Sequence, residues 1–424
     1  MTSEQLLQEI QNQKLDEQLI TLYGIENLAK AKQRILMLCE RFEAEFDPRA
    51  DIMLISAPGR TEIGGNHTDH QRGRVLAAAI DRDVLILAAT TQTSIARCRS
   101  DGFVIQDVDL SDREVHDSEK FTTEALIRGV SARIRALDFI TGGFDAVIAS
   151  TVLTGSGMSS SAAFEVALGT LFNNLYNEGK IPAATIAKIG QAAENIYFKK
   201  PCGIMDQMTS AVGGFVGIDF FDPNHAEVQK IDFDFATCGY TLCLVDTGSS
   251  HQDLSQEYAE MPRDMKRVAE YFEEEVLSEV DPNRFFEDIA KLRPITGDRA
   301  ILRAMHFFQE TERVVAEIDT LSSGDFQAFL ELMIESGRSS YMYNQNVINP
   351  KAQEQSLGLA LALSESYLKG RGAWRVHGGG LAGTIQVIVK NEDLAGYRQM
   401  IEEVFAKGSC HVMRIRSEGA IRIL

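Results

Sequence analysis

The sequence predicts an α+β protein, because strand patterns and helix patterns occupy different parts of the chain. Short apolar segments of strand length alternate with amphipathic helical segments over the first half. From about residue 252 to 370 the pattern is mostly helical, and short strand patterns return near the end. A glycine- and serine-rich segment, 154–163, connects a predicted strand to a predicted helix. The chain has 424 residues, which is long enough for two or more domains.

The individual elements follow from apolar spacing. Residues 1–45 have apolar residues at helical intervals and predict a helical N-terminal extension. Further helices are predicted at 123–138, 160–178, 184–198, 307–318, 326–336 and 394–405. Strands are predicted at 52–55, 75–80, 84–90, 144–148, 215–221, 240–246, 384–389, 412–416 and 421–424, the first of them ending in a Pro-Gly-Arg turn.

Composition excludes several classes of partner. A net charge of −19 argues against nucleic acid, because affinity for nucleic acid rests on Lys and Arg that neutralise phosphates. No apolar run reaches the length of a membrane span, and the first residues lack the features of a signal peptide, so we expect a cytoplasmic protein without a membrane partner. The six cysteines are scattered without zinc or CxxC spacing, which indicates reduced structural thiols.

The segment 154–163 has the features of a phosphate-binding loop. Gly155 and Gly157 allow close backbone approach to a ligand, and the free N–H groups of the following helix would face an anion. Three serines, 159–161, can cap the helix and add hydroxyl ligands. No Gly-Lys-Ser/Thr follows, so the loop is not a Walker A motif. The alternative is a flexible connector that caps a core helix.

A second candidate segment is 57–70. It contains a strand end followed by a glycine-rich loop with Arg60, Asn66, His67 and Asp69, whose donors and acceptors suit the hydroxyls of a sugar. A loop held by its own side-chain turns is the alternative. His67 and His70 could be read as metal ligands, but no third ligand accompanies them.

Two shorter segments complete the set. Asp206 follows a glycine loop and is flanked by Met205 and Met208, so partial shielding from water would suit it to act as a general base, although an ordinary cap or turn residue is the alternative. Residues 376–385 are mostly small, which indicates close backbone approach to a ligand or to another loop, or else a glycine hairpin.

Taken together and in this order, the loops at 154–163, 201–207 and 376–385, with the segment at 57–70, resemble the motifs of the GHMP small-molecule kinases. The segments at 57–70 and 201–207 resemble those of the galactokinase family in particular. The resemblance implies a GHMP kinase fold, with an N-terminal ribosomal S5-like β-α-β domain and a C-terminal ferredoxin-like domain with helical additions. We expect the extension at 1–45, the N-terminal domain at 46–230 and the C-terminal domain at 231–424, with the active site between the two domains.

The resemblance also implies roles for single residues. Asp206 would be the catalytic base, and Arg60 would lie beside the attacking hydroxyl. Magnesium would be bound by Ser161 and Glu194, oxygen donors of the kind that this cation prefers. The ATP phosphates would be bound by Gly155, Ser156, Gly157, Met158, Ser159, Ser160 and Ser161. The sugar would contact Asn66, His67, Asp69, Gly203 and Tyr258, and the third-motif loop Gly378, Gly379 and Gly380 would brace the phosphate loop.

Several positions depart from the family pattern. The galactokinase signature has glutamate where this chain has Asn66, tyrosine at His70 and asparagine at Glu62. Leu153 and Ser156 replace a proline and a glycine of the phosphate loop, and residues 381–384 depart from the usual third motif. The nucleotide and catalytic groups therefore match better than the sugar pocket.

The function implied is an ATP- and Mg²⁺-dependent sugar-1-kinase that acts on the anomeric hydroxyl of galactose or a close relative. Because Asn66 carries no charge, a substrate with a C6 carboxylate such as galacturonate is one alternative, and an N-acetylated hexose is another. A catalytically silent regulator that binds sugar and ATP is the alternative from a different class. The oligomeric state does not follow from the sequence, and we favour a monomer.

Overall fold

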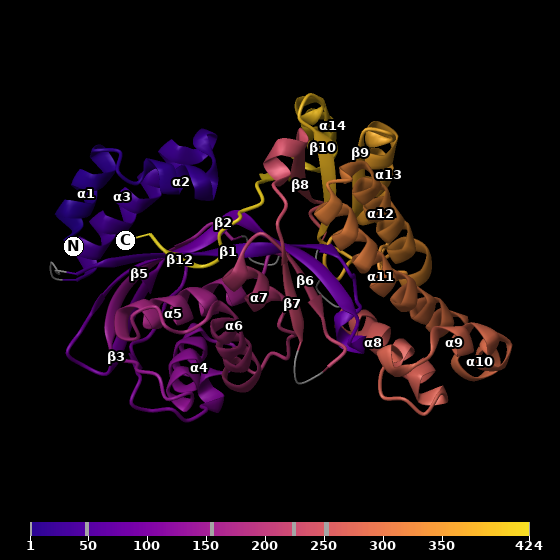
Figure 1. Ribbon diagram of the computed structural model, residues 1–424, viewed down its shortest axis with the longest axis horizontal. Coiled ribbons are helices and arrows are strands. Elements are labelled where there is room, and N and C mark those ends of the chain that lie inside the picture. The colour runs from indigo at the N-terminus through magenta and orange to yellow at the C-terminus, as the bar shows by residue number, and fades with distance from the viewer. Residues whose placement is uncertain (1, 47–50, 153–156, 223–225, 250–253, 424) are drawn as a thin grey trace.

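The computed structural model describes residues 2–46, 51–152, 157–222, 226–249 and 254–423 (Figure 1). In this part of the chain the strands form an eight-stranded and a four-stranded sheet. The first has the order β12-β1-β2-β5-β3-β4, with β6 paired to β2 and β7 paired to β6. Its strands are β1 (Met53–Gly64), β2 (Arg74–Thr90), β3 (Ile95–Ser100), β4 (Val108–Asp109), β5 (Phe144–Ser150), β6 (Phe215–Asp219), β7 (Glu227–Ile231) and β12 (Ile421–Arg422).

β1 is longer than the sequence predicts. It does not end at the Pro-Gly-Arg turn, and that prediction was wrong: the strand continues to Gly64 and is buried along its whole length. Its pairing with β2 shifts register between Pro58 and Arg60 and again between Glu62 and Gly64. These irregularities accommodate a proline and a glycine within a paired strand and re-aim the residues beside them.

β2 is a single strand where the sequence predicts two, at 75–80 and 84–90. The intervening Asp81, Arg82 and Asp83 resemble a polar turn, but Asp83 is buried and paired with Arg34 at 2.8 Å. The strand pairs with β6 through its first half and with β5 through its second half.

The alternation of β1 and β2 separates two hydrophobic cores. Leu54, Leu85 and Leu87 pack with the N-terminal helices, whereas their neighbours in sequence face the other side. The N-terminal helices, which confirm the predicted extension as helical, are α1 (Ser3–Gln11), α2 (Asp16–Tyr23) and α3 (Leu28–Glu45). The opposite face carries α4 (Thr123–Ala136), α5 (Ser160–Tyr176), α6 (Ala183–Ala192) and α7 (Met205–Val212), as Figure 1 shows.

The sheet of the second half has the order β11-β8-β10-β9, and its strands are β8 (Tyr240–Asp246), β9 (Gly372–Val376), β10 (Thr384–Lys390) and β11 (Cys410–Met413). The long helices α11 (Asp298–Ser323) and α12 (Phe326–Ser339) pack against each other, and α12 packs on β9. The remaining helices are α8 (Ser255–Tyr271), α9 (Pro282–Glu287), α10 (Ile289–Thr296), α13 (Ser356–Leu368) and α14 (Leu394–Phe405). No described helix is both long and apolar enough to cross a membrane.

The two halves are interlocked rather than merely adjacent. β12, from the predicted C-terminal domain, pairs with β1 through Ile55↔Arg422 and Ser56↔Ile421. The first sheet otherwise ends at β7, and the second begins at β8, so the predicted boundary at residue 230 lies close to the change of sheet. Figure 1 shows the yellow C-terminal segment running back to the violet strands of the first sheet.

Candidate active site

The centre of the candidate site is an ion pair between two segments that are distant in sequence. Arg60, at the first irregularity of β1, donates from Nε to Asp206 Oδ1 at 2.7 Å, and its Nη2 lies 2.7 Å from the same oxygen. Asp206 occupies the first turn of α7 and accepts a second hydrogen bond from the hydroxyl of Ser159. Arg60 also donates through Nη1 to the carbonyl of Gly157. The predicted catalytic pair is therefore in contact with the end of the predicted phosphate loop.

The described end of that loop leads directly into α5. Gly157 has φ +76° and Ser159 has φ +57°, so the chain turns sharply before Ser160 starts the helix. Ser159 occupies the N-cap position of α5, but its hydroxyl donates to Asp206 and makes no cap hydrogen bond. Met158 is fully buried in the core, while its carbonyl accepts from the backbone N–H of Arg60. Gly155 and Ser156 lie outside the described residues.

A second group of polar side chains lies beside the start of α5. Ser161 Oγ donates to Glu194 Oε1 at 2.8 Å, and Lys200 Nζ donates to the same oxygen at 2.8 Å. Gln207 Nε2 bridges Glu194 Oε2 and Glu165 Oε2, each at 2.9 Å. The Glu194 side chain is only 2% exposed, so the hydroxyl, the ammonium and the amide supply its charge and hydrogen-bond partners in place of water.

This group fits a magnesium ion that is shared with a nucleotide. Its donors are hydroxyl and carboxylate oxygens, and Glu165 Oε1 is buried without a hydrogen-bond partner. The described residues contain no cluster of three or more His, Cys, Asp or Glu side chains able to hold a metal ion. Mg²⁺ commonly uses one or two protein oxygens together with substrate phosphates, so a pair such as Ser161 and Glu194 meets its needs.

The electrostatics of this region follow from burial. Burial raises the pKa of the Glu165 carboxyl well above its usual value, and the neighbouring charge of Glu194 raises it further. The pKa of Lys200 is raised by its hydrogen bond and ion pair with Glu194, which outweigh the opposing effect of desolvation. Lys200 is therefore fully charged at neutral pH.

The predicted sugar-side residues come together from three segments. Asp69 Oδ2 lies close to the loop before α7, because a Cβ added to Gly203 would be 3.4 Å from that oxygen. His67 donates from Nε2 to the carbonyl of Gly379 at 3.0 Å. Tyr258, on α8, donates its hydroxyl to the carbonyl of Gly380. Burial raises the pKa of Tyr258 to about 12, so it is a neutral donor.

Asn66 differs from the other predicted sugar contacts. Its side chain is 1% exposed, and Nδ2 donates to Glu62 Oε1 at 2.9 Å and to the carbonyl of Gly378 at 2.7 Å. Its Oδ1 accepts from Ser340 Oγ at 3.2 Å and from Asn346 Nδ2 at 2.8 Å. Protein groups therefore occupy both the oxygen and the nitrogen of the amide. Asn66 is left out of the proposed sugar-binding residues for this reason.

The third-motif loop contacts both other loops. His377 lies between Thr61 Oγ1, 3.1 Å from Nε2, and Thr384 Oγ1, 2.9 Å from Nδ1. A Cβ added to Gly157 would be 3.1 Å from Cε1 of the same ring, so the phosphate loop passes directly over it. Burial, followed by the charges of Arg60 and Arg375, lowers the pKa of His377 to about 3. The ring is therefore a neutral spacer beneath the loop.

Sequence reasoning missed several residues of this site. It assigned no role to Lys200, and it singled out neither Glu165, Gln207 nor His377. The position of Gln207 directly after Asp206 is a signal that could have been used, because both residues lie in the first turn of α7. Glu165 is a charged residue within an otherwise apolar helical run, which is the pattern of a buried acid.

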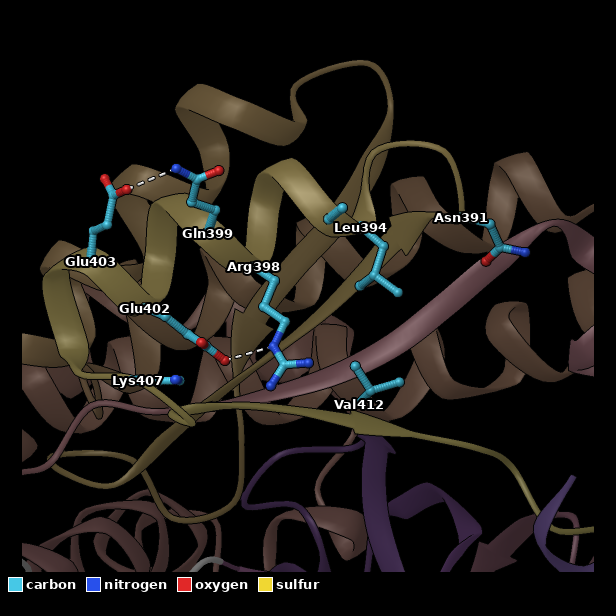
Figure 2. Close-up of a pocket in the computed structure, with 9 residues that line it drawn as sticks. Asn391, Leu394, Arg398, Gln399, Glu402, Glu403, Lys407 and Val412 are labelled. Carbon is cyan, nitrogen blue, oxygen red and sulfur yellow. Dashed lines mark hydrogen bonds and ion pairs between the residues drawn. The ribbon is translucent and has the colours of Figure 1, made fainter. Parts of the chain in front are cut away.

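A separate cavity of about 680 Å³ lies on the second half of the molecule, beside α14 and β11 (Figure 2). Arg398, Glu402 and Val412 line this cavity, and Arg398 forms an ion pair with Glu402. None of its lining residues belongs to the site described above.

Two family models match parts of this chain. The model of the GHMP kinases N terminal domain matches residues 125–214, and the galactokinase galactose-binding signature matches residues 40–90. Two solved structures share the fold. A galactokinase of Lactococcus lactis in complex with galactose has a TM-score of 0.76 and 22% identity, covering 90% of this chain and 98% of that one. The mevalonate kinase of Methanococcus jannaschii has a TM-score of 0.58 and 16% identity, covering 87% and 99%.

The fold and the arrangement of loops thus define a GHMP kinase, and the predicted fold class is confirmed. A galactokinase of Glaesserella parasuis is 30% identical over 375 residues, which is 87% of this chain and 92% of the relative. A galactokinase of Streptomyces coelicolor is 28% identical, again over 375 residues, covering 87% and 94%. The chain belongs to the galactokinase family.

Proposed function

We propose that the protein is an ATP-dependent kinase that phosphorylates the anomeric hydroxyl of galactose. The observation that carries the proposal is the contact of Arg60 with both Asp206 and the carbonyl of Gly157. This contact joins the group suited to accept a hydroxyl proton to the loop suited to hold a phosphate. Membership of the galactokinase family, together with the galactose-binding signature at 40–90, supports galactose as the acceptor.

In the proposed reaction the anomeric oxygen attacks the γ-phosphorus of ATP in line with the bond to the β-phosphate oxygen. Asp206 orients the hydroxyl and accepts its proton as the new O–P bond forms, while ADP leaves with the electrons of the broken bond. Arg60 stabilises the negative charge that develops on the attacking oxygen and on the transferring phosphoryl group. Such transfers depend mainly on positioning and electrostatics, which the ion pair and the start of α5 supply.

Magnesium completes the proposed site. Ser161 and Glu194 would hold the ion together with phosphate oxygens of the nucleotide, and the bound ion would neutralise phosphate charge. The N–H groups at the start of α5 add a second source of positive potential for the same phosphates. His67, Asp69, Gly203 and Tyr258 are the proposed sugar-binding residues.

The test is an ADP-release assay with galactose, galacturonate, N-acetylgalactosamine and glucose as acceptors. We expect galactose to give the highest kcat/KM, and Asp206→Asn to abolish most of the signal under the same conditions. ADP release with galacturonate or N-acetylgalactosamine but not with galactose would replace the acceptor in the proposal. Binding of galactose by calorimetry without ADP release from any acceptor would instead identify a regulator.

A further inference from the structure

Lys200 occupies an unusual position beside the proposed magnesium ligands. Its Nζ lies 2.8 Å from Glu194 Oε1, and within the described residues no other cation forms an ion pair with that carboxylate. The Glu194 side chain is 2% exposed, whereas the Lys200 side chain is 54% exposed. In this ion pair the carboxylate of Glu194 is buried, whereas the side chain of Lys200 is half-exposed to solvent.

The local backbone holds Glu194 but leaves Lys200 at the end of a turn. Glu194 lies in a short π-helix, Ala193–Phe198, that continues α6. Lys199 has φ +66°, which reverses the chain, and the backbone N–H of Lys200 then donates to the carbonyl of Glu194 at 3.1 Å. The flexible four-carbon side chain of Lys200 can consequently leave the carboxylate without moving the helix.

Glu194 Oε1, the oxygen that would bind the metal ion, accepts hydrogen bonds from two side chains. Ser161 Oγ and Lys200 Nζ each lie 2.8 Å from this one oxygen, while Oε2 is held by Gln207. A magnesium ion shared by Ser161 and Glu194 would use the same oxygen that the ammonium now contacts. Two cations on one buried oxygen repel each other strongly, because the surrounding protein screens charge less than water does.

We propose that Lys200 is a placeholder cation, which neutralises Glu194 in the metal-free protein and moves to the phosphate oxygens of the nucleotide when magnesium binds. Burying a carboxylate without a counter-ion costs free energy. The ammonium therefore stabilises the folded site before magnesium and the nucleotide bind. The ammonium shares Glu194 Oε1 with the hydroxyl of Ser161, so it lies beside the start of α5, where the phosphates are proposed to bind. An ammonium is a compact donor that suits phosphate oxygens. This role rests on the proposed function.

The experiment measures Mn²⁺ binding to the nucleotide-free protein by electron paramagnetic resonance, which needs no turnover. Lys200→Met removes the charge at similar length, Lys200→Arg keeps the charge, and the exposed neighbour Lys199→Met is the matched control. We expect Lys200→Met to bind Mn²⁺ about tenfold more tightly than wild type, and the other two variants to stay within about twofold. The same Lys200→Met protein should bind MgADP about tenfold more weakly in calorimetry.

The opposite changes in the two ligands are the signature of a placeholder. A lysine that only braces the π-helix would, when replaced by methionine, weaken both Mn²⁺ and MgADP binding. Unchanged or weaker Mn²⁺ binding in Lys200→Met, with an unchanged melting temperature, overturns the inference. Lys200→Gln is measured in parallel in case the methionine variant folds poorly. If wild type phosphorylates galactose and Ser161→Ala weakens Mn²⁺ binding, the proposed function stands whatever the lysine variants show.

Discussion

Exchanging the carboxylate at position 62 and the amide at position 66 tests the buried network that joins β1 to the C-terminal half. Asn66 Nδ2 donates to Glu62 Oε1, and Arg375 Nη2 donates to the same oxygen, both at 2.9 Å. Arg375 is fully buried and forms an ion pair with Glu62, while Glu310 and Glu317 also lie within electrostatic range of its charge. The galactokinase signature has the amide and the carboxylate in the opposite order at these two positions, which lie in hydrogen-bond contact here.

The single substitutions should be costly for different reasons. Asn66→Glu replaces a donor with a second carboxylate next to Glu62 and leaves the carbonyl of Gly378 without its N–H partner, which costs about 3–5 kcal/mol of unfolding free energy. Burial already raises the pKa of Glu62, so one of the two carboxyls takes up a proton and limits the cost. Glu62→Gln removes the carboxylate that forms an ion pair with the buried Arg375, and we expect a loss of about 3 kcal/mol.

The double variant should be less destabilised than the sum of its parts. Glu62→Gln removes the like charge that Asn66→Glu creates, and the new carboxylate stands next to Arg375. We expect a favourable coupling of about 2 kcal/mol, measured by urea unfolding of wild type, both single variants and the double variant at pH 7.5. Additivity within about 0.5 kcal/mol would refute the reasoning, because it would mean that the two side chains do not interact.

The remaining predictions concern the reaction and the pH response. Asp206→Asn and Arg60→Ala should each lower kcat by about a hundredfold while ATP binding persists, and near-normal turnover in Asp206→Asn would remove it as the base. Ser161→Ala and Glu194→Gln should raise the Mg²⁺ concentration needed for half-maximal rate, and an unchanged titration in both would remove them as ligands. His377, whose pKa falls from about 6.5 in the unfolded chain to about 3, stays neutral in the fold while the unfolded chain takes up a proton below pH 6.5. His377 should therefore contribute about 2 kcal/mol to the loss of stability between pH 7.5 and pH 5, to which the buried His70 and His306 also contribute. Unfolding of His377→Asn at the two pH values should show a shallower loss. An equally steep loss in that variant would contradict the assignment.

Local patterns predicted the parts of the fold that depend on neighbouring residues. The helix α14 begins and ends at the predicted residues, and α5 follows the glycine- and serine-rich loop as expected. The two irregular strands were predicted less well. In β1 the register shift keeps Pro58 and Gly59 within a paired strand, and in β2 buried ion pairs compensate Asp83. Neither effect leaves a trace in apolar periodicity.

The site was predictable only where a motif carried it. Arg60 and Asp206 are 146 residues apart in the chain and were paired through the family resemblance rather than through spacing. The surroundings of Asn66 could not be foreseen, because Ser340 and Asn346 reach it from 274 and 280 residues away. The contact of Lys200 with Glu194 depends on a π-turn and a left-handed residue, which are details of backbone hydrogen bonding.

The return of the chain to β1 has a consequence for how the molecule is assembled. Arg416 is fully buried and donates to Ser56 Oγ at 2.7 Å, although the two residues are 360 positions apart in the chain. Ser56 lies in β1, the strand that also carries Arg60. Without the C-terminal segment, β1 has an unpaired edge. Asp83 then keeps Arg34 but lacks Arg416, the second arginine that pairs with it. The first sheet therefore depends on a contact between the most distant parts of the chain, and contacts of this kind slow folding. A chain that lacks the C-terminal segment would present the edge of β1 at Ile55 and Ser56 to other proteins as an unpaired edge.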